Sequence, residues 1–206
     1  MGQRKRLAVV GAPRSGTRHV HITLRAAGLD VWHERMGPDG TVSGLFAVPH
    51  TWMPGAHRGQ PGEIPAAYSF DHRWALIRDP LRAIPSFAQV FQLGHLADWW
   101  EEVGVPMAEV DTLTQALRAW VATYEHLADE GAPFLRIEDF DRRWPELAEA
   151  LGLPSRRPAI GPQNMHHGLA SATWSDLETR DADYARRARA IATHHGYGEA
   201  EYGSRG

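Results

Sequence analysis

The 206-residue chain contains no cysteine. Disulfide bonds, thiolate catalysis and metal sites built on cysteine are therefore excluded. Lysine is nearly absent too, with Lys5 alone, so arginine carries almost all of the positive charge. Its planar guanidinium forks suit phosphate and sulfate groups. The sequence also shows neither an opening signal peptide nor an apolar run long enough to cross a membrane. We therefore expect a cytoplasmic protein with no membrane partner.

The charge balance is slightly acidic, with a formal net charge of −3, which argues against a nucleic-acid partner. A hydrophobic content of 43% and a charged content of 23% are ordinary for a globular protein, and the length suits one compact domain. We find no internal repeat and expect a single domain over residues 1–206. The adjacent pairs His166-His167 and His194-His195 lack the i,i+4 spacing of helical metal ligands, so we expect no metal.

A short segment near the start has the pattern of a phosphate-binding loop. The apolar run Leu7–Val10 predicts a strand, and Pro13-Arg14-Ser15-Gly16-Thr17-Arg18 follows it and opens an amphipathic stretch. Nucleotide triphosphatase loops read G-x-x-x-x-G-K-[ST], with the lysine on the β- and γ-phosphates and the hydroxyl on magnesium. Here Thr17 occupies the lysine position and Arg18 the hydroxyl position, whereas Arg14 places a cation inside the loop. The loop suits a phosphate but lacks the residues that hold a magnesium nucleotide.

Strand and helix patterns alternate along the chain. Strands are expected at about 6–10, 29–32, 74–77 and 133–137, and helices at about 17–27, 81–94, 113–127, 144–151 and 182–195. Residues 35–69, 95–110 and 154–172 show no periodicity and predict irregular loops. The alternation predicts an α/β fold, a three-layer sandwich with a central parallel sheet. Ligands of such sheets bind beyond the carboxyl ends of the strands, where Arg14, Glu34 and Arg78 are expected to converge.

Three segments in order resemble one family. The segment Gly11–Thr17 resembles the 5′-phosphosulfate loop of sulfotransferases that use 3′-phosphoadenosine 5′-phosphosulfate (PAPS). Arg78 and Ser86 keep the spacing of that family's 3′-phosphate motif, and Phe134–Phe140 is similar to its "LVRYEDL" strand. The "RKG" motif of the cytosolic small-molecule branch is absent, which points toward the carbohydrate-like branch, the tyrosyl-like branch or a short bacterial-type member, all with the P-loop sulfotransferase fold.

The resemblance implies a function and a set of site residues. It implies transfer of the sulfuryl group of PAPS, without a metal, to a hydroxyl of a carbohydrate, a small molecule or a tyrosine. The loop, which comprises Pro13, Arg14, Ser15, Gly16, Thr17 and Arg18, would hold the 5′-phosphosulfate, with the Arg14 guanidinium at the bridging oxygen. The 3′-phosphate would contact Arg78 and the Ser86 hydroxyl. The acceptor's proton would go to Glu34, with the neighbouring His33 as the second candidate and His50, His57 and His72 as weaker ones.

Blander interpretations stay open for several of these residues. Glu34 fits a solvated loop carboxylate, Arg78 fits an ion pair with Asp79 or Asp71, and Ser86 fits a surface position on a helix. The Arg156-Arg157 pair fits either a solvated loop or a contact with the 3′-phosphate. Two other functions also remain: a P-loop small-molecule kinase, and a domain that binds a nucleotide without catalysis. The sequence does not indicate the oligomeric state.

Overall fold

The computed structural model describes residues 3–47, 68–92, 96–161 and 171–198. The chain divides into two compact units. One comprises residues 1–77 and 126–167 and is called here the sheet unit, and the other comprises residues 78–125 and 168–206 and is called the helical unit. Each unit is described by itself, and the single domain expected from the chain length stays a prediction.

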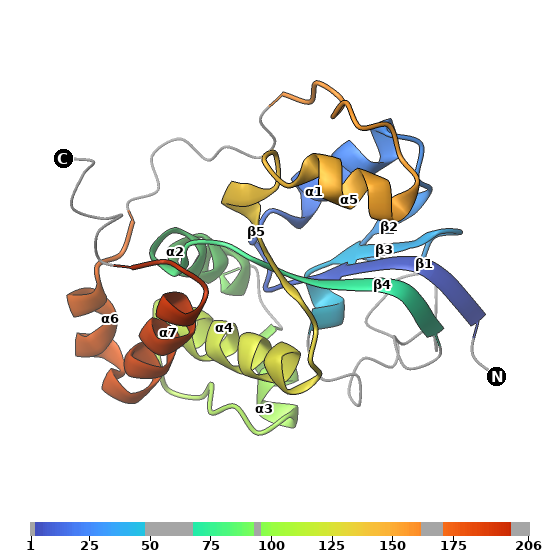
Figure 1. The fold of residues 1–206 in the computed structure, drawn as a ribbon. Helices are drawn as coiled ribbons and strands as arrows, with labels where there is room; N and C mark the ends of the chain where they lie inside the picture. Colours follow the sequence, from blue (N-terminus) through green and yellow to red (C-terminus); the bar gives the residue numbers. More distant parts are fainter. Residues whose placement is uncertain (1–2, 48–67, 93–95, 162–170, 199–206) are drawn as a thin grey trace. The chain divides into compact units, whose positions relative to one another are not determined.

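The sheet unit is built on five parallel strands in the order β2-β3-β1-β4-β5 (Figure 1). They are β1 (Gln3–Val10), β2 (Val31–His33), β3 (Gly40–Ser43), β4 (Tyr68–Ile77) and β5 (Phe134–Arg136). The predicted α/β class with a central parallel sheet flanked by helices is thus confirmed, and the arrangement is consistent with the expected three-layer sandwich. Because all five strands run the same way, their carboxyl ends meet at one edge, where α/β proteins bind ligands.

Two helices cover one face of this sheet, α1 (Thr17–Ala26) and α5 (Trp144–Leu151) (Figure 1). Leu7 and Val9 alternate along β1 toward that face, and Val20 and Leu24 recur at i,i+4 on α1. Each fully buried side chain of this size contributes about 1.5–3 kcal/mol. The same apolar cluster takes in Leu29, Val31, Val42, Leu76, Leu135, Phe140, Trp144, Leu147, Ala148 and Leu151. A short 3₁₀ turn, η4 (Ile137–Asp139), follows β5.

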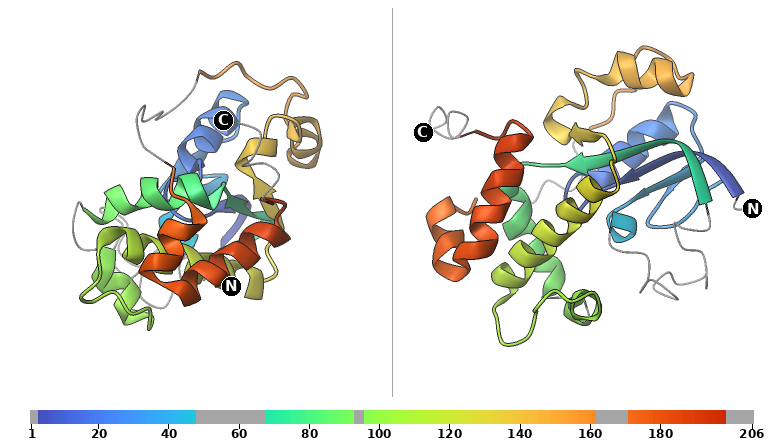
Figure 2. Two further views of the ribbon diagram at one scale, coloured as in Figure 1. Left: turned by 90° about the vertical axis from the view of Figure 1, so that its left-hand side faces the viewer. Right: turned by 60° about the horizontal axis from the view of Figure 1, so that its bottom comes forward.

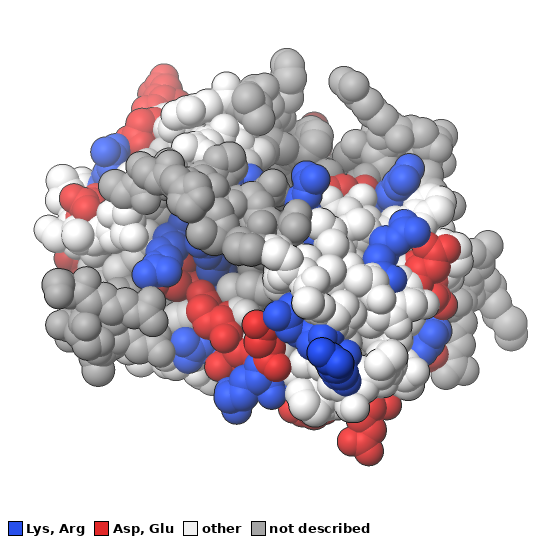
Figure 3. All heavy atoms as spheres, turned by 90° about the horizontal axis from the view of Figure 1, so that it is seen from above, with Lys and Arg blue, Asp and Glu red and all other residues white. Residues whose placement is uncertain are grey.

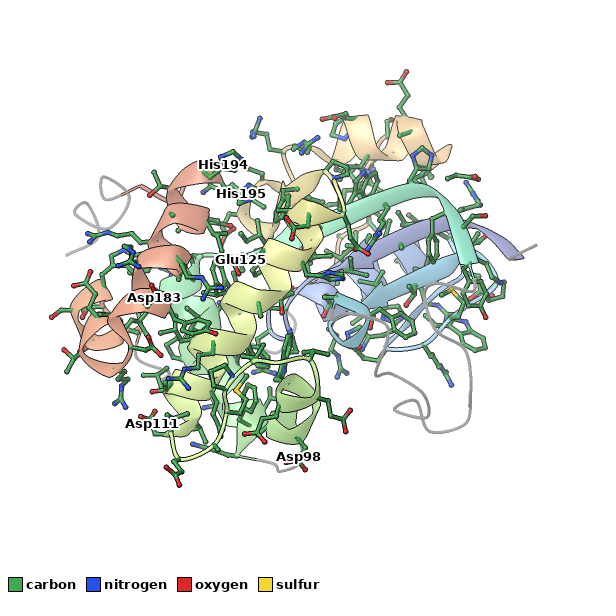
Figure 4. All side chains as sticks on the ribbon, turned by 90° about the horizontal axis from the view of Figure 1, so that it is seen from below. Asp98, Asp111, Glu125, Asp183, His194 and His195 are labelled. Carbon is green, nitrogen blue, oxygen red and sulfur yellow. The ribbon has the colours of Figure 1, made fainter. Side chains whose placement is uncertain are left out.

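The helical unit comprises α2 (Pro80–Phe91), α3 (Leu96–Glu102), most of α4 (Thr112–Asp129), α6 (Trp174–Arg180) and α7 (Ala182–His194). The helices α6 and α7 lie side by side in both views of Figure 2. Arg187 ties α7 to α4, because its Nε donates to Glu125 Oε1 at 2.9 Å. Within α7, its Nη1 also lies 3.6 Å from Asp183 Oδ2. Figure 4 labels these two carboxylates on their helices. Asp111 caps the start of α4, accepting from the Leu113 and Thr114 amides.

Two segments that were expected to be irregular, and the stretch before the expected last helix, contain regular structure instead. The segment 35–69, predicted to be irregular, contains β3, the 3₁₀ turn η1 (Leu45–Ala47) and the start of β4, while residues 48–67 lie outside the described part. All four residues of β3 are buried, so it shows no alternation of apolar and polar side chains. The segment 95–110, also predicted to be irregular, contains α3, and α6 precedes the expected last helix. Both helices have only seven residues, too short to show a clear period.

The described surface mixes charges of both signs. Seen from above, Lys and Arg side chains lie next to Asp and Glu side chains (Figure 3). Ion pairs of the sheet unit include Arg143–Glu146 at 2.8 Å and Arg157–Asp141 at 3.0 Å. Within the described ranges, no helix combines the length and apolar character needed to span a membrane.

Candidate functional site

The loop from β1 to α1 ends in a helix start that carries no side-chain cap. Gly16 is the N-cap residue, and the first turn contains no acidic side chain. The first amides of an α-helix have no partner within the helix, and the helix dipole adds partial positive charge there. The Ser15 amide donates to the Ala12 carbonyl at 3.1 Å and closes the turn. The amides of Thr17 and Arg18 are therefore the ones best placed for an anion.

Gly16 has two reasons to be glycine. Its φ is +102°, a conformation that residues with a Cβ rarely adopt. A Cβ at this position would lie 2.6 Å from Cγ1 and 2.9 Å from Cδ1 of Ile137 in η4. The loop thus packs its backbone directly on the segment that follows β5, which fixes the start of α1 against the sheet.

Strained backbone is concentrated beside this loop. Among the described residues, three that are not glycine have positive φ: Arg14 (74°), Glu34 (56°) and Glu109 (58°). The conformation disfavours each by about 1–2 kcal/mol and is a frequent feature of functional sites. Two of the three, Arg14 and Glu34, are residues that the sequence assigns to the candidate site. Their strain fixes the direction in which each side chain leaves the backbone.

Glu34 is held by donors on both of its carboxylate oxygens. The Ser43 hydroxyl donates to Oε2 at 2.5 Å, and the Gly44 amide donates to Oε1 at 2.9 Å. Ser43 is fully buried, and its oxygen accepts in turn from the Phe46 amide at 3.0 Å. The Glu34 amide continues the β2–β3 pairing, donating to Val42 O at 3.2 Å. Glu34 is therefore an ordered carboxylate at the ends of two strands, and the interpretation as a solvated loop residue is wrong.

His33 connects Glu34 to the start of α1. Its Nε2 lies 3.2 Å from Oγ1 of Thr17, the first residue of that helix, and 3.4 Å from Glu34 Oε1. The His33 side chain is 29% exposed and that of Glu34 is 30% exposed, so both can be reached by a ligand. The His21 ring on α1 stacks at a tilt beside His33, with 5.5 Å between the ring centroids.

The electrostatic environment keeps these histidines neutral near pH 7. Burial lowers the pKa of His33, the Glu34 carboxylate partly opposes that change, and the Arg18 charge adds to it. Burial, followed by the charges of His33, Arg25, Arg18 and Arg35, lowers the pKa of His21 to about 4. Both shifts show that the positive charge of Arg18 acts on the same small region as the uncapped helix start.

The structure brings most of the expected site residues together. Pro13, Arg14, Ser15, Gly16, Thr17, Arg18, His33 and Glu34 all belong to the sheet unit and surround the carboxyl ends of β1 and β2. Pro13 packs against Gly44, where a Cβ would lie 3.1 Å from Pro13 Cα. Ser15 is buried, and its Oγ has no hydrogen-bond partner among the described residues.

Arg78 and Ser86 belong to the helical unit. Arg78 is half-buried and directly follows β4. Ser86 is 5% exposed on α2, so the alternative interpretation of Ser86 as a surface serine is wrong. Asp79 caps α2 by accepting from the Leu81 amide at 3.0 Å and also lies 3.5 Å from Arg82 Nε. The convergence of Arg78 with Arg14 and Glu34 stays a prediction.

The weaker candidates receive no further support. His50 and His57 lie outside the described residues, and His72 is half-buried in β4 beside Trp74. Arg157 pairs with Asp141, while Arg156 is exposed. In the part of the chain that the structure describes, no three His, Asp or Glu side chains gather as metal ligands do.

Sequence reasoning missed Ser43, Gly44 and His21. Ser43 and Gly44 follow a strand that has no alternation, so nothing in the sequence pairs them with Glu34. His21 stands four residues after Thr17, a spacing that puts both on one face of α1, and that signal was available. No model of a known protein family matches this chain, and no curated protein matches it.

Proposed function

We propose that this protein is a PAPS-dependent sulfotransferase that transfers a sulfuryl group to an acceptor hydroxyl. The observation that carries the proposal is the contact between an uncapped phosphate-binding helix start and a candidate base. Thr17, the first residue of α1, lies within hydrogen-bond distance of His33, which adjoins the fixed carboxylate of Glu34. Sulfuryl transfer needs these two features side by side, because the attacking hydroxyl loses its proton next to the bound donor.

The loop supplies the groups that a phosphosulfate needs. The amides at the start of α1 and the charge of Arg18 favour the 5′-phosphate. Arg14 leaves the loop in a fixed direction and would stabilise the charge that grows on the bridging oxygen as the sulfur–oxygen bond breaks. The buried Ser15 hydroxyl has no partner among the described residues, and a bound anion would supply an acceptor for it. Arg78 and Ser86 would bind the 3′-phosphate, as the family resemblance implies.

The kinase alternative is less well supported by the same residues. A kinase loop needs a lysine at position 17 and a magnesium-binding hydroxyl at position 18, which are Thr17 and Arg18 here. The only side-chain hydroxyl at these two positions, that of Thr17, already contacts His33 Nε2. A nucleotide-binding domain without catalysis would not require the left-handed backbone that positions Glu34 against Ser43 and Gly44.

A thermal-shift titration tests the proposed donor site. Adenosine 3′,5′-bisphosphate at 100 times its Kd is expected to stabilise the fold by about 2.7 kcal/mol, and ATP with magnesium by much less. Preference for the magnesium nucleotide would support the kinase instead. In a PAPS turnover assay, R14A is expected to lower kcat by roughly 10²–10³, the range for one lost charge stabiliser.

The matched control for R14A is R25A, which removes an exposed arginine near the far end of α1. It is expected to leave kcat unchanged. If R14A changed only KM, Arg14 would be a binding contact and its role at the bridging oxygen would be wrong. If the wild type turned over no acceptor while binding the bisphosphate, the domain would be a binding module.

A further inference from the structure

We propose that the two candidate bases have separate roles: His33 accepts the proton of the acceptor hydroxyl, Glu34 orients and stabilises His33, and Ser43 with Gly44 fixes Glu34. This inference rests on the proposed function and assigns roles within the same site. It adds Ser43 as a positioning residue that the sequence did not indicate.

Both oxygens of the Glu34 carboxylate already accept a hydrogen bond. Oε2 accepts from the Ser43 hydroxyl and Oε1 accepts from the Gly44 amide. Both donors hold the carboxylate in one orientation, and Oε1 also lies 3.4 Å from His33 Nε2. The carboxylate is therefore arranged as a fixed acceptor, which is the role of a carboxylate that orients a histidine rather than the role of the base itself.

The surroundings of Nε2 determine which tautomer His33 adopts. Nε2 is the ring nitrogen that lies 3.4 Å from Glu34 Oε1 and 3.2 Å from Thr17 Oγ1. A carboxylate beside Nε2 favours the tautomer that carries its hydrogen there. The lone pair is then on Nδ1, and a neutral imidazole with a lone pair is the form that a general base needs.

The His33 ring is attached to the helix that would hold the sulfuryl donor. The Thr17 contact attaches the His33 ring to the first residue of α1, the same residue whose amide faces the proposed 5′-phosphate. The His21 ring supports His33 from the second turn of that helix. His33 is thus attached through Nε2 to the element that would hold the donor, and the proposed proton acceptor, Nδ1, is the second nitrogen of the same ring.

The reaction balances with these roles. The acceptor's O–H bond breaks and its proton binds to His33 Nδ1. The oxygen forms a bond to sulfur, while the bond from sulfur to the bridging phosphate oxygen breaks and its electron pair leaves with adenosine 3′,5′-bisphosphate. The imidazolium produced lies 3.4 Å from the Glu34 carboxylate, which balances its charge until the proton passes to solvent.

Several charged groups face His33 and determine its titration. Glu34 comes from the end of β2, whereas Arg18 and His21 come from α1. His21 in turn is influenced by Arg25 and Arg35. The Glu34 carboxylate favours the protonated form of His33, so its removal should lower the pKa of His33, and removal of Arg18 should raise it.

Titration of the His33 ring signal by NMR tests, without any ligand, whether Glu34 acts on His33 and whether Ser43 fixes Glu34. E34Q is expected to lower the pKa of His33, because the carboxylate charge that favours the protonated ring is removed. S43A should give a smaller shift in the same direction, because Glu34 loses one of its two anchors. The control is T41V, which removes another buried hydroxyl from β3 without touching Glu34 and should leave the His33 pKa unchanged.

Release of adenosine 3′,5′-bisphosphate from PAPS, with 2-naphthol as the acceptor, tests the division of roles. H33Q is expected to lower kcat by roughly 10²–10⁴ and to abolish the acid limb of the pH–rate profile. E34Q should keep the acid limb, move it to lower pH, and lose less activity than H33Q. The same shift of the limb in S43A, with T41V unchanged, would distinguish positioning from general loss of structure.

The opposite results overturn the inference in distinguishable ways. An H33Q variant that keeps its rate while E34Q is inactive would make Glu34 the base. An unchanged His33 pKa in E34Q and S43A would show that the carboxylate does not act on the ring. A wild type that releases no bisphosphate from PAPS with 2-naphthol, a tyrosine peptide or a carbohydrate as the acceptor would refute the proposed sulfotransferase and the catalytic role of His33 together, even where the NMR shifts appear as expected.

Discussion

Replacing Gly16 with alanine should be one of the most damaging single-methyl changes in the sheet unit. The substitution adds one Cβ to the residue that begins α1. That atom would lie 2.6 Å from Ile137 Cγ1 and 2.9 Å from Ile137 Cδ1, whereas ordinary carbon contacts are about 3.5–4.0 Å. Ile137 or the loop must therefore shift by about 1 Å.

Two terms make up the expected loss of stability. Holding alanine at φ +102° disfavours the folded state by about 1–2 kcal/mol. Forcing an extra methyl group into a packed contact adds about 1–3 kcal/mol. The sum, about 3 kcal/mol, is a large fraction of the 5–15 kcal/mol that stabilises typical domains. The shift also moves the amides that would bind the anion.

Gly28 provides a matched control for the backbone term. It ends α1 with the same φ of +102°, but nothing lies within 4 Å of its Cβ position. G28A should therefore lose only the stability that the left-handed backbone costs an alanine. Any stabilisation from a less flexible unfolded chain applies equally to both variants. Urea unfolding of wild type, G16A and G28A should place G16A about 1–3 kcal/mol below G28A.

A double-mutant cycle separates the contact with Ile137 from other effects. The I137A substitution removes both carbons that the new Cβ would meet. The loss caused by G16A should then be smaller in the I137A background than in wild type, with a coupling of about 1 kcal/mol or more. Equal losses for G16A and G28A, or additive effects of G16A and I137A, would refute this account of the loop.

Three further predictions follow from other contacts. The pKa of His21 is lowered to about 4, so the neutral ring's contribution to the free energy of unfolding is complete above pH 6.5 and is lost as the pH falls through 4. In pH-dependent unfolding, H21Q should reduce the loss of stability at acid pH by about 1 kcal/mol. The loss caused by His195, whose pKa is also lowered to about 4, should remain. G44A places a Cβ 3.1 Å from the loop backbone, and urea unfolding should show a loss of about 1–2 kcal/mol. R187M breaks the paired contact with Glu125, and because both side chains are more than a third exposed the loss should be only about 0.5–1 kcal/mol and should shrink in 0.5 M salt.

The loop and its helix could be predicted because several local signals agree there. The apolar run of β1, Gly16 at the turn and Gly28 at the helix end each have a physical cause that acts within a few residues. The same holds for α5, which spans the predicted residues 144–151 and is followed by Gly152 with φ +63°. Glu34 and His33 could be chosen as candidates because they stand at the end of a short apolar strand.

The support around Glu34 could not be predicted from the sequence. Ser43 acquires its role because β3 pairs with both β1 and β2, and that pairing joins residues with no local pattern in common. All four side chains of β3 are buried, so the period of two that marks a half-exposed strand is missing. The left-handed backbone at Glu34 is likewise invisible in a sequence, since glutamate rarely adopts it.

The contact between Thr17 and His33 gives a physical meaning to the position at which this loop departs from the nucleotide triphosphatase pattern. A lysine at position 17 would bring a second cation to the anion and would leave His33 without its hydroxyl partner. Threonine instead keeps a short polar group at the helix start, so the loop is joined to the His33–Glu34 pair rather than to a metal. Arg14 then supplies the cation from inside the loop, at a backbone angle that few residues adopt without another constraint. In the proposed sulfotransferase, anion binding and proton acceptance would be joined through one residue, Thr17, and a change there should affect both.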